Sequence, residues 1–456
     1  MNLKSLNFVI ILILTLFILI QSDTTIDFSS SGSGYTVSSN TVTISTDGTY
    51  ELSGSQTDKK IIVSSDSTLN MNSFSLINSG ALTPIVISSN NKVNIVLSDT
   101  STLQDSSSNE NEGAIYLQSG ASLTISGTGT LNINPYKLMA INGTEGTSLT
   151  VNGGPTIKIS SSCSSVGGIY LRDSITFNNA IYTYSCSSGT NHAIDTEGEI
   201  KIIKGTYTLT AGNGKGIQAE NKLYIGEENG DNSDLTLTIT TSSEGIEAKG
   251  IEIHSGIITV DADEDGINAA AAGSECDETV KCSGNCACYI KFTGGYLRLT
   301  SGEDGLDANG DITISGGDII VFAAFNSGNQ PIDQDGLLSI KGGNVVAAGS
   351  KSMGGVAASD SQNHATYSGS ISKGASLQVL KSGNSEEILS LETPKEANYI
   401  YFSFPSAFTA KLNNVQIATS DSSSSYDDDD ENITPINNQS YLKLSTIISI
   451  LSIMLI

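Results

Sequence analysis

The sequence contains no tryptophan and only 7 prolines among 456 residues, and its basic residues are few. Two arginines, Arg172 and Arg298, belong to a total of 22 Lys and Arg, against 48 Asp and Glu, which gives a net charge of −26. This charge excludes nucleic acid as a partner, because phosphates require a basic surface. Cations, or polymers bridged through cations, are the expected partners. The alternative is that the acidic surface only keeps a secreted protein soluble.

Long hydrophobic runs occur only at the two ends of the chain. The first, Phe8–Ile20, follows Lys4 and precedes polar residues, which predicts a secretory signal peptide over residues 1–22. A retained membrane anchor is the alternative, although the run is shorter than the ~20 residues that a spanning helix needs. We therefore expect the mature chain to be secreted.

The second run closes the chain. Residues 416–443 form a low-complexity acidic tail, and residues 444–456 are apolar. This pattern indicates a glycosylphosphatidylinositol anchor signal, with a short transmembrane tail as the alternative. We expect an extracellular, cell-surface protein that meets the membrane only through this anchor or tail. Asn142, Asn432 and Asn438 lie in sequons that a eukaryotic secretory pathway would glycosylate.

Internal repeats determine the fold prediction. An alternating apolar strand, a turn and a second short strand recur in Gly205–Ala219, Leu235–Ala248, Gly256–Ala269 and Gly295–Ala308. Alternation sends every second side chain to one face, and such a face is buried only if successive units stack at ~4.8 Å spacing. The sequence therefore predicts an all-β chain whose residues 23–370 form a right-handed parallel β-helix, or β-solenoid, with an all-apolar interior.

Two further segments complete the predicted organisation. Residues 371–415 read as strands outside the repeat, suited to a small C-terminal β cap over the open end of the stack. The repeat glycines Gly245 and Gly266 are 21 residues apart, but Gly266 and Gly305 are 39 apart. The excess locates a Cys-rich insertion at about residues 270–288.

Six cysteines in a secreted chain are expected to form disulfides. Cys163 and Cys186 are 23 residues apart, about one coil, which predicts a bridge between neighbouring coils. The other four crowd into the insertion, where we expect them to pair among themselves. Zinc is the alternative for these four, although their spacing lacks paired CxxC knuckles. They are Cys276, Cys282, Cys286 and Cys288.

Acidic and amide residues recur at two positions of the repeat, one before the glycine and one two residues after it. Equivalent positions of a solenoid lie above one another, so these side chains would form vertical rows of oxygens. Carboxylates ~5 Å apart raise one another's pKa or recruit a counter-ion, and calcium bonds oxygen at ~2.3–2.6 Å. The alternative is a set of splayed, solvated turn acids. The predicted calcium ligands are Glu244, Glu247, Asp265, Asn268, Asp304, Asp307 and Asp333.

Signals for catalysis are weaker. The few basic candidates include His192, His254 and His364, and so many equivalent acids occur that no pair stands out as acid and nucleophile. We assign no catalytic residue.

Several segments resemble the bacterial-type carbohydrate-binding β-helix proteins related to polysaccharide lyases. The resemblance rests on Asp47–Gly54, Glu112–Tyr116 and above all Asp265–Ala269 and Asp304–Gly317, and it covers about residues 42–405. It implies a right-handed parallel β-helix that binds calcium and an acidic, pectin-like or cellulosic polysaccharide, without established catalysis. The insertion, the tail, and Lys215 and Gln218 at positions where acids are expected depart from the family pattern.

Three functions remain open at this point. The first is a surface-displayed polysaccharide-binding protein in which calcium bridges acids and sugar, Tyr296 stacks on sugar rings and Arg298 contributes to binding. The second is a calcium-dependent polysaccharide lyase, with Arg172 or Arg298 as the base. The third is an adhesive or structural surface protein.

Overall fold

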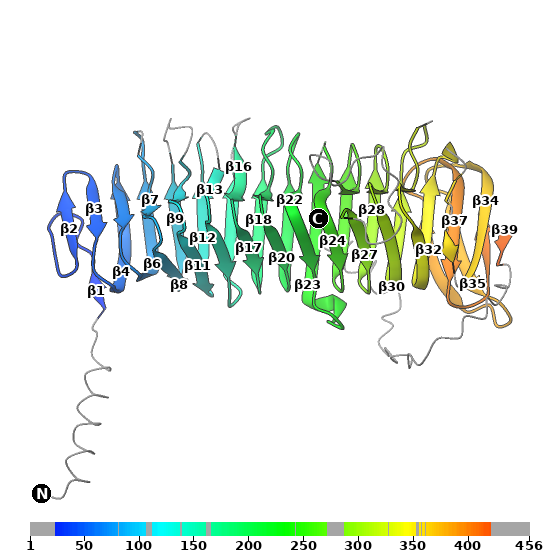
Figure 1. The fold of residues 1–456 in the computed structure, drawn as a ribbon, viewed down its shortest axis with the longest axis horizontal. Helices are drawn as coiled ribbons and strands as arrows, with labels where there is room; N and C mark the ends of the chain where they lie inside the picture. The colour runs from blue at the N-terminus through cyan, green and yellow to red at the C-terminus, as the bar shows by residue number, and fades with distance from the viewer. Residues whose placement is uncertain are drawn as a thin grey trace, which may run out of the picture.

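The computed structural model describes residues 23–420, with gaps at 81, 106–111, 137–138, 161–165, 242, 271–286, 327, 353–354, 357 and 361. Within these residues the regular elements are all strands except for one short 3-10 helix, η1 (Asn232–Asp234), and turns connect them. The strands stack along one long axis (Figure 1), which confirms the predicted all-β parallel β-helix. The predicted signal peptide lies outside the described residues, and so does the predicted tail after residue 420. The first residues of that tail belong to β39 (Val415–Thr419), so the C-terminal β segment continues beyond residue 415. Within the described ranges, no helix combines the length and hydrophobicity that a membrane span requires.

Three parallel faces form the solenoid, and along the first face each strand pairs with its counterpart in the next coil. The strands of the first face are β3 (Thr41–Ile44), β5 (Lys60–Val63), β7 (Ile85–Ile87), β10 (Ile115–Leu117), β13 (Met139–Gly143), β16 (Gly167–Leu171), β19 (Ile194–Thr196), the first parts of β22 (Ile217–Ile225) and β24 (Ile246–Ile253), β26 (Ile267–Ala269), β29 (Leu306–Ala308) and β31 (Ile332–Gln334).

The second face continues each coil after a short turn. Its strands are β1 (Thr24–Thr25), β4 (Gly48–Thr57), β6 (Ser67–Ile77), β8 (Lys92–Leu97), β11 (Ser122–Gly127), β14 (Ser148–Val151), β17 (Ser174–Phe177), β20 (Glu199–Ile202), the later parts of β22 and β24, β27 (Tyr289–Phe292), the first parts of β30 (Asp311–Phe322) and β32 (Leu338–Gly349), and β33 (Ser359–Asp360).

The third face completes the coil before the chain turns back to the first. Its strands are the later part of β6, β9 (Thr100–Gln104), β12 (Thr130–Asn134), β15 (Thr156–Ser160), β18 (Ala180–Ser185), β21 (Gly205–Thr210), β23 (Leu235–Thr241), β25 (Ile257–Ala262), β28 (Tyr296–Ser301) and the later parts of β30 and β32.

The core is a set of ladders that run along the solenoid, one side chain per coil. On the first face each inward residue lies directly over its counterpart, and burying one such isoleucine stabilises the fold by roughly 1.5–3 kcal/mol. The predicted stacking of alternating strands is therefore confirmed. The first-face ladder consists of Ile61, Ile85, Ile115, Ile141, Ile169, Ile194, Ile217, Ile246, Ile267, Leu306 and Ile332, each at most 1% exposed.

The interior is not wholly apolar, which corrects the prediction. Tyr182, Tyr184 and Tyr207 of the third face are fully buried. Their hydroxyls donate to the backbone oxygens of Ala193 at 2.9 Å, Val166 at 2.7 Å and Lys204 at 2.8 Å. A buried hydroxyl that finds such an acceptor avoids the cost of an unmade hydrogen bond, so tyrosine fills the core here as phenylalanine would.

The two ends of the stack are closed by antiparallel strands. At the N-terminal end β2 (Tyr35–Ser38) pairs with β3, and at the other end β37 (Ala397–Phe404) pairs with both β32 and β34 (Asn363–Ile371). Antiparallel strands end the parallel stack and so cover an edge that would otherwise invite aggregation.

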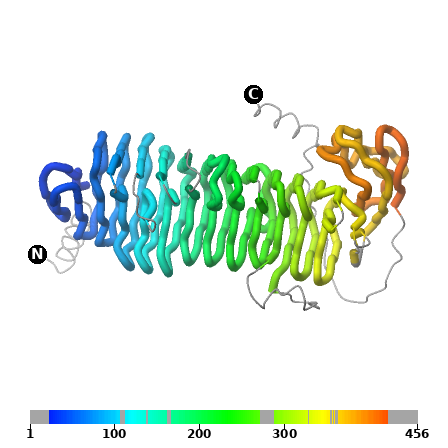
Figure 2. Tube along the Cα trace, turned by 90° about the horizontal axis from the view of Figure 1, so that it is seen from above, coloured from blue at the N-terminus to red at the C-terminus, as the bar shows by residue number. Residues whose placement is uncertain are grey.

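A separate four-stranded sheet follows, and Figure 2 shows these C-terminal strands at the end of the solenoid and to one side of its axis. Its side chains pack on the outer side of the last third-face strands, on Ile320, Phe322 and Val346. The C-terminal segment thus covers a flank of the solenoid as well as its end. The sheet consists of β35 (Ser376–Lys381), β36 (Glu387–Glu392), β38 (Phe408–Leu412) and β39 (Val415–Thr419).

The structure does not support the predicted disulfide between Cys163 and Cys186. Cys186 directly follows β18 as a buried thiol that packs in the solenoid core near Tyr184. Cys163 lies outside the described residues. Cys276, Cys282 and Cys286 also lie outside them, and Cys288 is buried just before β27, so the pairing within the insertion stays a prediction.

Candidate functional site

Two rows of polar side chains run along the outside of the first face, as the repeat predicts. We call the first the turn row, because its members lie in the turns, two residues before the first-face strands begin. Each repeat glycine donates its backbone N–H to the turn-row carbonyl of the next coil, at 3.0 Å for Gly245 to Asp265 and for Gly266 to Asp304. These bonds fix the vertical order of the row. The turn row is His192, Lys215, Glu244, Asp265, Asp304 and Gln330.

The second row, which we call the strand row, lies at the centre of the first-face strands. Its members are in register from coil to coil. Each directly follows a residue of the buried ladder, and because successive side chains of a strand alternate between faces, it points outward. Parallel strands lie ~4.8 Å apart, so neighbouring side chains of the row are close enough to interact. The strand row is Asp195, Gln218, Glu247, Asn268, Asp307 and Asp333.

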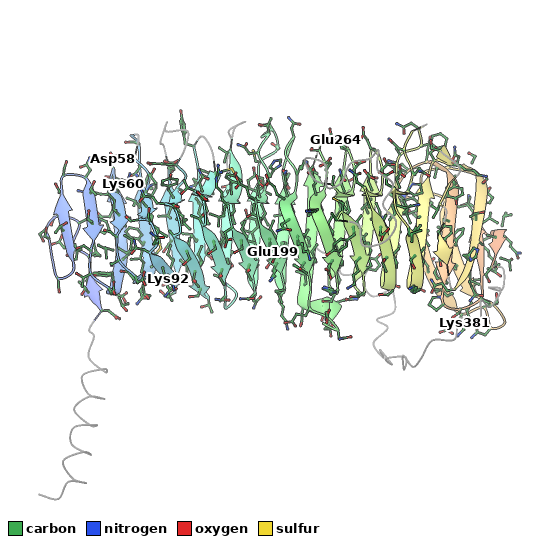
Figure 3. All side chains as sticks on the ribbon, in the orientation of Figure 1. Asp58, Lys60, Lys92, Glu199, Glu264 and Lys381 are labelled. Carbon is green, nitrogen blue, oxygen red and sulfur yellow. The ribbon has the colours of Figure 1, made fainter. Side chains whose placement is uncertain are left out.

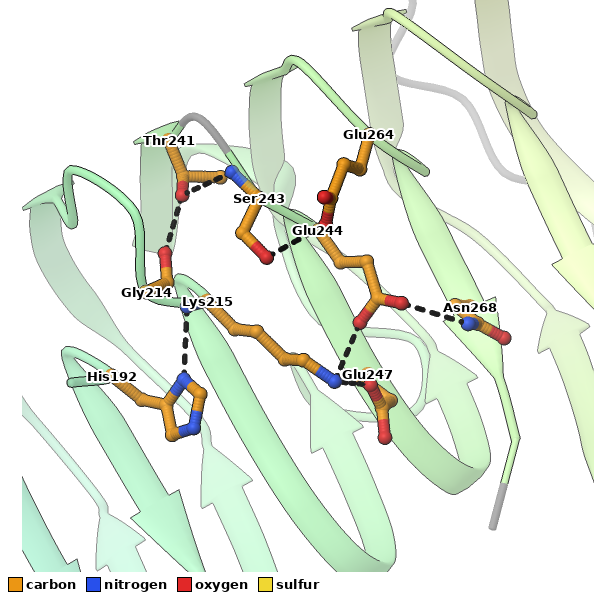
Figure 4. A network of polar contacts seen from close by, with 9 residues as sticks. All are labelled: His192, Gly214, Lys215, Thr241, Ser243, Glu244, Glu247, Glu264 and Asn268. Carbon is orange, nitrogen blue, oxygen red and sulfur yellow. Dashed lines mark hydrogen bonds and ion pairs between the residues drawn. The ribbon is translucent and has the colours of Figure 1, made fainter. Parts of the chain in front are cut away.

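Lys215 neutralises the first acidic coil (Figure 4). Its ammonium lies 2.7 Å from a carboxylate oxygen of Glu244 and forms a second ion pair with Glu247. The lysine side chain is 20% exposed and the two glutamates 17% and 18%, so water screens these pairs only in part. The position where an acid was expected therefore holds an internal counter-ion.

His192 supports this arrangement from the preceding coil. Its Nδ1 accepts the backbone N–H of Lys215 at 2.9 Å, which requires that this nitrogen carry no proton. Burial and the neighbouring lysine lower the pKa of His192 to about 4. We therefore expect a neutral imidazole at physiological pH, which leaves Lys215 as the only cation of the two rows.

The next coils have acids without such a cation. Burial raises the pKa of Asp304 to about 7, and the charges of Asp265 and Asp333 add to this effect. A backbone hydrogen bond from Gln330 lowers the pKa but does not offset the increase. Burial and the surrounding aspartates raise the pKa of Asp307 to about 8. The pKa of Asp265 rises to about 6, chiefly through burial, although the Asp304 N–H donates to its Oδ1 at 2.8 Å. Ionising all three carboxyl groups is therefore opposed by the fold.

Asn268 lies between the two kinds of coil. Its amide nitrogen donates to Glu244 Oε1 at 3.2 Å, and its side chain is 9% exposed. Its Oδ1 is buried without a hydrogen bond in the structure, in the strand row between Glu247 and Asp307. A buried acceptor without a donor is costly, and an oxygen of this kind suits a bound cation. Within the described ranges, however, no three His, Cys, Asp or Glu side chains already converge as metal ligands.

Asp195, at the upstream end of the strand row, has a pKa raised to about 7 by burial and by Glu220. Further upstream the character of the first face changes. Arg172 contacts a carboxylate oxygen of Glu197 at 2.8 Å and lies over the ring of Tyr170. The Tyr170 hydroxyl donates to the same carboxylate at 2.8 Å. Arg172 is thus paired, and it lies three coils before the coil of Glu244 and Glu247.

The predicted sugar-binding residues Tyr296 and Arg298 lie on the outer side of the third face, away from the two rows. Arg298 is exposed, but Tyr296 is only 9% exposed and belongs to the cluster under the C-terminal sheet. Its ring therefore has little surface to offer a sugar. The sequence could not reveal this, because the covering strands come a hundred residues later in the chain.

The comparison with protein families identifies the chain. No curated protein and no solved structure matches it. A family model described as carbohydrate-binding domain-containing protein matches residues 38–274 and again residues 233–396, so together the two matches cover nearly the whole solenoid. The chain belongs to the family of carbohydrate-binding domain-containing proteins.

Proposed function

We propose that the first face binds an acidic polysaccharide, such as pectin, through calcium held by Asp265, Asp304 and Asp307. The observation that carries the proposal is the pair of stacked rows, in which these three carboxyl groups lie in successive coils without a lysine or arginine at any row position after Lys215. Each has a raised pKa, so an external cation would favour their ionised form.

Calcium is the cation that fits the donor set. The rows offer only oxygen ligands beyond Lys215, and the Oδ1 of Asn268 adds a buried neutral oxygen. Hard cations with six to eight oxygen ligands match such a surface, whereas zinc prefers nitrogen and sulfur. Calcium held by these side chains would supply positive charge at the outer side of the first face, where sugar carboxylates would bind. Secretion and attachment to a cell surface, as the chain termini predict, would expose the site to millimolar calcium.

The alternative of a polysaccharide lyase has less support. Proton abstraction needs a base within reach of the calcium-bound sugar. Arg172 is paired with Glu197, and Arg298 lies on the third face. A binding role therefore explains the first face better than catalysis does.

Retention on immobilised polygalacturonate tests the proposal. We expect the mature chain to bind in millimolar calcium and to elute with a chelator, and the same mixture should show no unsaturated product by ultraviolet absorbance. The double variant Asp304→Asn, Asp307→Asn should lose most of the binding. Asn keeps the side-chain acceptor that Gln330 N–H uses on Asp304.

The matched control is Glu264→Gln. Glu264 directly precedes Asp265, is exposed at the upper edge of the solenoid in Figure 3, and accepts a hydrogen bond from Ser243 at 2.9 Å. Its replacement removes one charge from the turn of the preceding coil, outside both rows. Equal losses in the control and in the double variant would refute the site, as would retention that survives the chelator.

A further inference from the structure

The second face carries an aromatic surface that the calcium proposal does not use. Two outward rows cross its middle coils, and each contains one tyrosine. Because the rows are two residues apart along every strand, they form one continuous patch on the flat sheet. The first row is Glu199, Lys222, Gly250, Tyr289 and Asp311, and the second is Lys201, Tyr224, Glu252, Lys291 and Thr313.

Tyr289 lies across the neighbouring strand instead of standing up from the sheet. A Cβ atom added to Gly250 would come within 2.9 Å of the Tyr289 ring. The absence of a side chain at Gly250 therefore provides the space that this ring occupies. At the far end of the ring, the hydroxyl donates to Glu252 Oε1 at 2.8 Å. Gly250 and the Glu252 carboxylate together hold the ring against β24, and the Tyr289 side chain stays partly exposed.

Tyr224 provides a second partly exposed ring two strands away, at roughly 10 Å along the solenoid axis. Lys201 lies 5.4 Å from the centre of the Tyr224 ring, and Lys222 lies 5.9 Å from the centre of the Tyr289 ring. Both lysine side chains are long and flexible, so a ligand can displace them from the rings. Two aromatic rings on a flat sheet, each bordered by hydrogen-bonding groups, are the arrangement by which proteins stack on pyranose rings.

Charge on this patch is balanced, in contrast to the acidic rows of the first face. The two rows contain as many basic as acidic residues: Lys201, Lys222 and Lys291, and Glu199, Glu252 and Asp311. Within the patch Glu252 lies 3.5 Å from the Lys291 ammonium.

His254 lies at the edge of the patch. Its Nε2 is 3.7 Å from Glu252, and its Nδ1 is 2.8 Å from the Thr293 hydroxyl. Fixed, mutually paired polar groups suit the hydroxyls of an uncharged sugar, while a protein of net charge −26 would repel an anionic chain that brings no calcium.

We propose that this patch is a second polysaccharide-binding site, which takes a neutral pyranose polymer without calcium. Tyr289 and Tyr224 stack on sugar rings two coils apart, and Glu252, Lys291 and Lys222 exchange hydrogen bonds with the hydroxyls. The polymer axis runs along the solenoid, because that is the direction in which the two rings repeat. This site is independent of the acidic rows, which lie on the first face.

Affinity electrophoresis of the full mature chain in chelator tests the site. The gels contain hydroxyethylcellulose, galactomannan or soluble starch, which are three uncharged polymers. We expect at least one to retard the protein, with about a tenfold weaker affinity for Tyr289→Ala or Tyr224→Ala, because a stacked ring contributes on the order of 1.4 kcal/mol. The matched control is Tyr136→Ala, which removes a 52% exposed tyrosine that lies just after β12 of the third face.

Gly250→Ala tests whether the space at Gly250 positions the Tyr289 ring. The variant retains both tyrosines, but its new methyl group displaces the Tyr289 ring, so we expect a loss close to that of Tyr289→Ala. Tyr289→Phe should bind nearly as well as the unaltered chain. Migration unaffected by all three polymers overturns the proposal, as does equal retardation of the Tyr289, Tyr224 and Tyr136 variants. The Asp304→Asn, Asp307→Asn variant should be retarded normally, which separates failure of this site from failure of the calcium site.

Discussion

Two neighbouring parts of the first face both stack partly buried carboxyl groups, but they differ in what neutralises the charge of these groups. In the coil of Glu244 and Glu247 the acids share the ammonium of Lys215, which the chain itself supplies. In the coil of Asp304 and Asp307 the same row positions are acidic, yet the rows supply no cation there and the pKa values of the two aspartates rise to about 7 and 8. The backbone is equivalent in both, so the difference comes from side-chain chemistry alone.

The contrast indicates which coils depend on the solvent. An internal lysine satisfies its acids at all calcium concentrations, whereas the downstream aspartates must either hold protons or bind an ion from outside. A solenoid that repeats one coil can therefore combine structural and ligand-binding coils without a change of fold.

The largest expected effect comes from removing the internal cation. Lys215→Met leaves two largely buried glutamates without a counter-charge, and breaking such a pair costs roughly 3 kcal/mol. We expect a marked drop in the melting temperature in chelator, measured by circular dichroism, and a larger calcium-induced recovery than in the unaltered chain. Lys201→Met is the control, because its 3.7 Å pair with Glu199 is exposed and contributes little. A melting temperature that falls no further in Lys215→Met than in this control would contradict the internal counter-ion.

A smaller effect should appear when the pH is changed. The folded chain keeps protons on Asp304 and Asp307 up to pH about 7 and 8, whereas the unfolded chain releases them near pH 4. Between these values the folded state binds more protons, so its stability decreases as the pH rises. In chelator, we expect the unfolding free energy in urea to fall between pH 5 and pH 8 by at least ~1.4 kcal/mol, which is the contribution of one carboxyl that keeps its proton over one pH unit. Calcium should flatten this slope, because it stabilises the ionised carboxylates. A slope that is the same with and without calcium would argue against binding at these aspartates.

The contrast between the coils could be predicted from the sequence only in part. The similar motifs Asp265–Ala269 and Asp304–Ala308 align the two coils across the insertion, so the rows of Asp265 and Asp304 follow from the repeated motif. The role of Lys215 was less accessible, because the sequence shows a departure from the acidic pattern but not the distance to Glu244. The calcium ligands themselves stay a prediction.

The second face was harder still to foresee. Tyr289 reaches the position opposite Gly250 after the long insertion, and a register shift between β22 and β24 places Lys222 on the other side of Gly250. Sequence spacing across an insertion does not give register. Similarly, the burial of Tyr296 depends on packing by β35 to β38, whose order in the chain carries no signal for where they dock.

The smallest effect is expected at Asn268, where the two kinds of coil meet. Asn268→Leu is nearly isosteric and removes the buried Oδ1, which has no hydrogen bond in the structure, together with a donor 3.2 Å from Glu244. Losing the hydrogen bond lowers stability and removing the unsatisfied Oδ1 raises it, so we expect a net change in chelator of no more than about 1 kcal/mol. If Oδ1 is a calcium ligand, the midpoint of the calcium-dependent rise in melting temperature should also move to a several-fold higher calcium concentration, because one oxygen of the coordination shell is gone.

Gln218→Leu is the matched control, one row position before Glu247. It removes an amide from the coil of Lys215 and should leave the midpoint unchanged. Equal midpoints in the two variants would exclude Asn268 from the calcium site and confine the ion to the three aspartates.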